Sequence, residues 1–197
     1  MRQVFALAQM ITLCLCLTLL CACARGETVL PQEKIRSEFE AARQVEMTLK
    51  LTADYGTRIY EYTVSYTGSG DIGTLEILQP ESIAGLRAEL REGSAYLVYD
   101  GTEFETGAIL PDGVSPVDAL PMLITQWQTG YVTDAVSESY KGLDTVALTT
   151  AVSDAVSLRT WFDGETLLPV HAEISYNNSV VLFCDFEDVV LHRENAG

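Results

Sequence analysis

The amino-acid sequence predicts an α+β fold that is mostly β, in which a long antiparallel meander is accompanied by two helices. Apolar and polar residues alternate with a period of two from residue 45 onward, as in strands with one buried face. The alternating runs are short and are separated by tight-turn signals such as Asp100-Gly101. Such strands pair with their sequence neighbours, and we count about 10–11 of them, well above the usual strand share.

The segment that begins at Pro31 is predicted to be the first helix. Proline suits the first turn of a helix, and Ile35, Phe39 and Ala42 recur at the spacing of one helical face. Near Gln44 the period changes to two, which predicts a strand with one dry face. That face carries Val45, Met47, Leu49, Leu51 and Ala53.

Further strands follow at turn-bounded runs, and one helix interrupts them. The helix is predicted over 115–127, with Ser115 or Asp118 as its cap and Gly130 as its end. Pro121 fits the first turn if Asp118 is the cap and otherwise kinks the helix. The further strands are expected at 58–66, 72–78, 83–90, 95–99, 102–106, 132–139, 145–151, 157–162, 170–176 and 179–186, and 189–191 is left open as an additional one.

The first 23 residues have the features of an export signal. A short basic start precedes an apolar run from Val4 to Leu20, and small residues close it. About 17 apolar residues are also near the lower limit for spanning a bilayer, so a single uncleaved membrane helix is the alternative.

The end of the run resembles a bacterial lipobox, with an aliphatic residue three before a cysteine and a small residue directly before it. On that resemblance the chain is cut between Ala22 and Cys23, and Cys23 carries the lipid, with palmitate among its acyl chains. Cys21 fits worse, because bulky Leu20 would stand directly before the cut. We therefore expect a lipid-anchored protein on the extracytoplasmic face of the cell membrane.

This processing divides the chain into three parts: a lipoprotein signal peptide at 1–22, a lipidated tether at 23–30, and a single domain at 31–197. The domain has Cys184 as its one cysteine, which rules out an internal disulfide and favours a small buried hydrophobe. The formal charge of −16 argues against nucleic acid and against an anionic membrane surface, leaving the lipid on Cys23 as the attachment.

The order of these elements resembles the LolA/LolB-like lipoprotein-carrier superfamily, in which an N-terminal helix leads into a long meander with inserted helices. The similar stretches are 43–51, 99–102, 115–127 and 162–170, and the resemblance covers nearly the whole mature chain. It implies that the strands form a curved sheet, an incomplete barrel. Because the soluble carriers of the family are not lipidated, a membrane-fixed member similar to the LppX and GerS-type lipoproteins fits the lipobox better.

Groups suited to catalysis are few. His171 and His192 are the two histidines, and we expect His171 to be a partly exposed surface residue rather than a general base. Nucleophile elbows, zinc spacings and phosphate loops do not occur in the sequence. We therefore expect no enzyme activity, no cofactor and no metal.

Two binding functions remain. In the first, the curved sheet holds a hydrophobic ligand, an acyl chain or a lipoprotein lipid, in a half-barrel cavity. The residues expected to line that cavity, or else to fill the core, are Tyr60, Tyr62, Val64, Tyr66, Leu75, Ile77, Tyr96, Val98, Leu123 and Trp127. In the second, the anchored domain binds an envelope protein, as a GerS-type germination lipoprotein assists a cell-wall or cortex enzyme.

Overall fold

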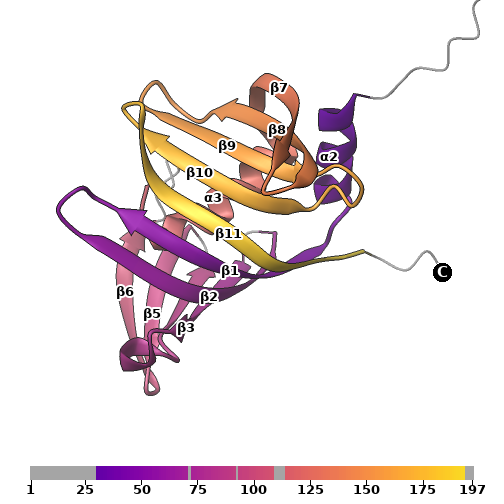
Figure 1. The fold of residues 1–197 in the computed structure, drawn as a ribbon. Coiled ribbons are helices and arrows are strands. Elements are labelled where there is room, and N and C mark those ends of the chain that lie inside the picture. The colour runs from indigo at the N-terminus through magenta and orange to yellow at the C-terminus, as the bar shows by residue number, and fades with distance from the viewer. Residues whose placement is uncertain (1–29, 71, 92, 109–113, 194–197) are drawn as a thin grey trace, which may run out of the picture. The chain divides into compact units, whose positions relative to one another are not determined.

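Eleven strands form one continuous antiparallel sheet in the order β6-β5-β4-β3-β2-β1-β11-β10-β9-β8-β7 (Figure 1). The computed structural model describes residues 30–70, 72–91, 93–108 and 114–193, so residues 1–22 and Cys23 lie outside the described residues. The strands are β1 (Gln44–Asp54), β2 (Ile59–Ser69), β3 (Ile72–Gln79), β4 (Arg87–Arg91), β5 (Ser94–Tyr99), β6 (Thr102–Ala108), β7 (Tyr131–Tyr140), β8 (Leu143–Ala151), β9 (Val156–Asp163), β10 (Pro169–Tyr176) and β11 (Ser179–His192).

The sheet is an incomplete barrel, as the sequence predicts, because its edge strands β6 and β7 are not paired with each other. The two halves of the chain meet in the middle of the sheet, where β1 pairs with β11. The pairing runs from Gln44 opposite His192 to Ala53 opposite Leu182. The helix α3 (Pro116–Thr129) connects one edge of the sheet to the other. In Figure 1 this helix lies behind the strands.

The core lies between the sheet and the helices α3 and α2 (Pro31–Glu40). Its centre is Trp127 of α3, whose ring lies 4.9 Å from that of Phe39 and 5.7 Å from those of Phe162 and Phe186. The Trp127 indole Nε1 donates a hydrogen bond of 3.0 Å to the Thr160 hydroxyl. We call the face of the sheet that contacts these helices the inner face and the opposite one the outer face.

The position of the N-cap decides which proline of α3 lies in its first turn. Ser115 is the N-cap, and its hydroxyl accepts from the backbone N–H of Asp118 at 3.3 Å. Pro116 therefore occupies the first turn, while Pro121 lies inside the helix, where its carbonyl accepts from the Thr125 hydroxyl at 2.9 Å. No helix among the described residues has the length and the apolar character needed to cross a membrane.

The expected strands differ from the structure in two places. The run 83–90 is not one strand: a short 3-10 helix, η2 (Glu81–Ile83), is followed by a turn and then by β4. The turn uses Gly85 at φ +82°, a conformation that favours glycine, and its N–H donates to the Ile77 carbonyl. At the other end, 179–186 and 189–191 are one strand, β11, which continues past an irregularity opposite Thr48 and Leu49.

Candidate functional site

Two glycines face each other on the inner face of the sheet. Gly68 of β2 pairs with Gly73 of β3, Val45 of β1 flanks Gly68, and Leu90 of β4 flanks Gly73. These four residues form a row across four strands, with side chains at its two ends and none in the middle. We call this row the glycine trough.

Tyr66 lies in the glycine trough. A Cβ built on Gly68 would stand 2.5 Å from the Tyr66 hydroxyl, and one built on Gly73 would stand 2.7 Å from it. Both positions therefore need glycine while the ring keeps this place. The side chain is only 4% exposed, and burial raises the pKa of its phenol to about 12.

The helix α3 lies over the glycine trough, and the cavity between them has a volume of about 520 Å³ and is partly open to solvent. That volume is in the range of small-molecule sites, roughly 300–1,000 Å³. The lining is more apolar than polar, and its polar side chains are Arg43, Tyr66, Thr125 and Gln128. The full lining is Ala42, Arg43, Val45, Tyr66, Gly68, Gly70, Ile72, Gly73, Leu90, Gly93, Pro121, Ile124, Thr125 and Gln128.

Of the ten residues that the sequence proposes as cavity lining, Tyr66 lines this cavity. Four others are buried in the core around it: Val64, Leu75, Leu123 and Trp127. Tyr62 and Ile77 pack against that core and are partly buried, while Tyr60 is 38% exposed and stacks on Tyr62. These eight residues therefore belong to the inner face of the sheet or to α3, and most of them fill the core rather than enclose a cavity.

Tyr96 and Val98 lie on the outer face, so their place in that set was wrong. On β4 and β5 the buried Ala88 pairs with Leu97, and this register turns Tyr96 and Val98 away from the core. The Tyr96 ring instead receives the Arg91 guanidinium, 4.0 Å from its centroid.

Sequence reasoning missed the glycine trough because the predicted strand 58–66 ends before Gly68. The structure extends β2 to Ser69, so Gly68 is a strand residue that faces Gly73. A glycine in a strand often marks a close approach of another group, and that signal was available at both positions. Nothing in the local sequence indicates that Pro121 and Ile124 of α3 line this cavity.

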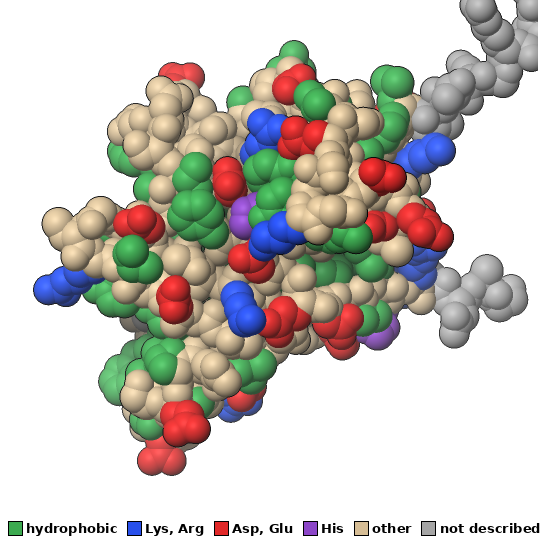
Figure 2. Space-filling model, in the orientation of Figure 1, with side chains coloured by type: hydrophobic (Ala, Val, Ile, Leu, Met, Phe, Trp, Pro, Cys, Tyr) green, Lys and Arg blue, Asp and Glu red, His purple; other side chains and the backbone are tan. Residues whose placement is uncertain are grey.

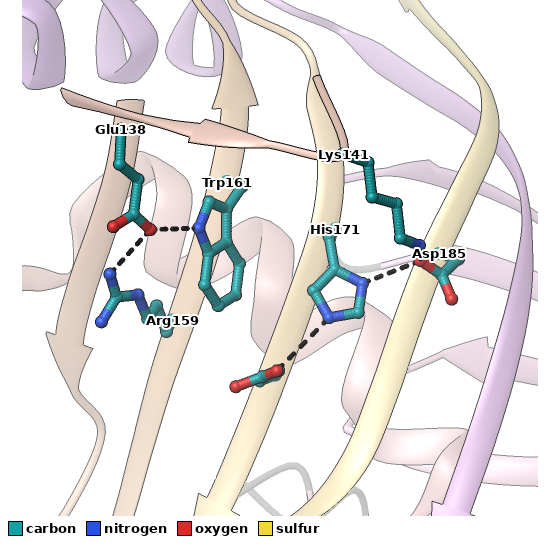
Figure 3. Close-up of polar contacts among 7 residues, drawn as sticks. Glu138, Lys141, Arg159, Trp161, His171 and Asp185 are labelled. Carbon is teal, nitrogen blue, oxygen red and sulfur yellow. Dashed lines mark hydrogen bonds and ion pairs between the residues drawn. The ribbon is translucent and has the colours of Figure 1, made fainter. Parts of the chain in front are cut away.

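A second group of polar and aromatic side chains gathers on the outer face (Figure 3). We call it the outer-face cluster; its members are Glu138, Tyr140, Lys141, Arg159, Trp161, His171, Glu173 and Asp185. His171 is only 4% exposed, which corrects the expectation of a partly exposed histidine. Its Nδ1 lies 2.9 Å from Asp185 Oδ1, and its Nε2 lies 3.5 Å from Glu173 Oε1.

The tip of the β7–β8 hairpin covers His171. Tyr140 stacks on the imidazole with ring centroids 4.9 Å apart, and Lys141 Nζ reaches Asp185 Oδ1 on β11 at 2.8 Å. Burial alone would raise the pKa of Asp185, but the hydrogen bond from Lys141 and the charges of His171 and Lys141 outweigh it and lower that pKa. The contact fastens the hairpin to the outer face.

Glu138 connects Trp161 and Arg159 in the same cluster, although the buried Arg159 Nε has no hydrogen-bond partner among the described residues. Glu138 accepts from the Trp161 indole at 2.5 Å and from Arg159 at 2.8 Å, and these hydrogen bonds lower the pKa of Glu138. Among residues 30–193 where described, three His, Cys, Asp or Glu side chains do not come together in a group able to hold a metal ion. The face seen in Figure 2 shows acidic side chains scattered among the hydrophobic ones rather than gathered in a block.

No protein-family model matches the chain, and no curated protein matches its sequence. Solved structures resemble it in fold. An uncharacterized conserved protein from Thermus thermophilus has TM-score 0.50 and 8% identity, covering 84% of this chain and 90% of that chain. A LolA superfamily protein from Nitrosomonas europaea has TM-score 0.43 and 13% identity, covering 85% and 96%. The Mycobacterium tuberculosis lipoprotein LppX has TM-score 0.44 and 12% identity, covering 84% and 95%.

One of these structures is named as a LolA superfamily protein. At identities of 8–13% the likeness concerns the fold alone. What the cavity holds has to be argued from its own residues.

Proposed function

We propose that this protein is a membrane-anchored extracytoplasmic lipoprotein whose domain binds a hydrophobic ligand, an acyl chain or a lipoprotein lipid. The ligand occupies the cavity between α3 and the glycine trough. The protein is attached to the cell membrane through the lipid on Cys23, and it acts by binding rather than by catalysis.

The observation that carries this proposal is a cavity of about 520 Å³ whose lining is more apolar than polar. The space depends on Gly68 and Gly73, because any other residue at either position would place a Cβ against Tyr66. A chain of methylene groups would bury about 0.8 kcal/mol of hydrophobic free energy for each group that it removes from water.

A cavity-filling variant tests the proposal. Ile124 lines the cavity from α3, and Ile124→Trp should fill part of it. The matched control is Ile59→Trp, the same substitution at a residue that is 61% exposed and does not line the cavity. The mature protein in lipid nanodiscs is labelled with a photoreactive palmitoyl ester, and the saturable crosslinking is measured by mass spectrometry.

Crosslinking should map to α3 and to β1–β4, and Ile124→Trp should weaken it at least tenfold while Ile59→Trp leaves it unchanged. Equal labelling of both variants would show that the probe binds elsewhere on the protein. Organic extraction of the purified protein adds an independent measurement, since a bound lipid should be recovered from the wild type and not from Ile124→Trp.

The second candidate function is binding of an envelope protein, such as the cell-wall or cortex enzyme that a GerS-type lipoprotein assists. The observation that favours it is the pair of unpaired edge strands, which carry exposed aromatic side chains: Phe104 on β6 is 59% exposed and Tyr131 on β7 is 76% exposed. A photoreactive amino acid at position 104 or 131 should then crosslink a discrete envelope protein in living cells. A ligand-free domain that crosslinks such a partner would replace the lipid-binding proposal.

A further inference from the structure

We propose that the Tyr66 hydroxyl is the polar anchor of this cavity, where it donates a hydrogen bond to the carbonyl oxygen of a neutral acyl ester. The site would then select ester-linked acyl chains over plain hydrocarbons of equal length. This inference rests on the proposed function of the cavity, and it adds the chemical class of the ligand and the residue that recognises it.

Tyr66 is 4% exposed, and its hydroxyl makes no hydrogen bond to another described residue. A hydroxyl that binds water in an empty site can exchange that water for an acceptor on a ligand. The hydroxyl is accessible from the cavity, since Tyr66 is one of its lining residues. A donor in this position is explained by an acceptor that the ligand brings.

The glycine trough holds this donor at a fixed place. The backbone of Gly68 and Gly73 contacts the tip of the ring from below, so the hydroxyl cannot sink further toward the sheet. On either side of it, Val45 and Leu90 provide apolar side chains, and Ile124 of α3 lies across the cavity. An acyl ester fits this arrangement, with its carbonyl at Tyr66 and its methylene chain against the apolar lining.

The electrostatics favour a neutral carbonyl over a carboxylate. Burial raises the pKa of Tyr66 to about 12, so the phenol stays protonated and remains a donor at any physiological pH. The same low-dielectric surroundings disfavour a buried carboxylate. The formal charge of −16 opposes the approach of an anionic ligand, whereas Arg43, which also lines the cavity, attracts one, so an ionised fatty acid is included among the probes.

The variant Tyr66→Phe removes the hydroxyl and keeps the ring. Binding of three photoreactive C16 probes is titrated on the mature protein in nanodiscs: a methyl ester, a hydrocarbon of equal length and an ionised fatty acid. The wild type should bind the ester about 5-fold more tightly than the hydrocarbon, the factor that corresponds to a net hydrogen bond of about 1 kcal/mol. Tyr66→Phe should weaken ester binding about 5-fold and leave hydrocarbon binding unchanged.

A stability measurement keeps the result interpretable. Because the hydroxyl has no partner among the described residues, Tyr66→Phe should leave the urea midpoint of the domain unchanged or raise it. A lowered midpoint would mean that the hydroxyl has a structural partner, and the inference would be wrong. Gly73→Ala provides a second variant, since its Cβ displaces the Tyr66 ring and should weaken the ester and the hydrocarbon together.

The outcomes separate this inference from the proposed function. Equal losses of ester and hydrocarbon binding in Tyr66→Phe, or no loss of either, would refute the role of the hydroxyl while the cavity remains an acyl site. Preferential loss of the ionised fatty acid would refute the neutral ester as the ligand class. If no probe binds the wild type saturably, the proposed function fails and the inference fails with it.

Discussion

The substitution Trp127→Ala should cost the domain about 5 kcal/mol of its free energy of unfolding. Removing a buried tryptophan costs about 3–5 kcal/mol through lost transfer energy and the cavity left behind. Trp127 is 5% exposed and packs against three phenylalanine rings, which places it at the upper end of that range. Its loss also leaves the hydroxyl of Thr160, a residue that is 1% exposed, without the indole donor, which is a second reason to expect the upper end of the range.

A second substitution divides this cost into its parts. Trp127→Phe keeps an aromatic ring among the three phenylalanines but removes the hydrogen bond to Thr160, so it should cost about 2 kcal/mol. Both variants are measured on residues 24–197 by urea denaturation at 25 °C, followed by far-UV circular dichroism. A loss below about 2 kcal/mol in Trp127→Ala would contradict the placement of α3 in the permanent core. It would favour instead a helix that moves as a lid over the cavity.

Three further predictions concern single side chains. Cys184 is fully buried and its thiol pKa is raised to about 12, so iodoacetamide at pH 8 should label it slowly in the native protein and rapidly in urea; fast native labelling would contradict its burial. The pKa values of Asp163 and Asp185 are lowered in the folded state, so their contribution to stability is present above the ordinary carboxyl range near pH 4 and is lost as pH falls below it. In Asp163→Asn the urea midpoint should therefore fall less steeply as the pH is lowered through this range. An unchanged slope of the midpoint against pH would contradict this. Cys23→Ala should abolish metabolic labelling with palmitate, and undiminished labelling would move the lipid to Cys21 or remove it.

The sequence predicts strands well wherever apolar and polar residues alternate strictly. Val45 to Ala53 is such a run, and the structure places all five of its apolar residues in the core. Where alternation is lost, the strand itself is still predicted correctly, but the choice of its buried face is not. The run Ala95 to Tyr99 is apolar at every position, so the pattern cannot tell which residues face inward, and the pairing with β4 decides it.

The candidate site was harder to predict because long-range contacts create it. Tyr66 was expected to line a cavity, but its role depends on Gly73, which another strand brings beside Gly68. The burial of His171 likewise depends on Tyr140 and Lys141, about 30 residues earlier in the chain. No local pattern encodes contacts of this kind.

The pairing of β1 with β11 has a consequence for how the chain folds. These strands lie at opposite ends of the domain sequence, yet they form the central seam of the sheet. Until β11 is made, β1 is an unprotected edge that exposes backbone donors, acceptors and an apolar face to other chains. Closing so long a loop is entropically costly, so this step should be late and slow.

Because β1 pairs with β11, a newly synthesised chain needs the C-terminal strand to complete its fold. A chain that stops before residue 179 lacks β11 and is left with two separate groups of strands, neither of which can close the core around Trp127. Such fragments are expected to aggregate or to be degraded rather than to persist as smaller domains. Proteolysis and chaperone demand should therefore be greatest during the interval before the last 14-residue strand has docked.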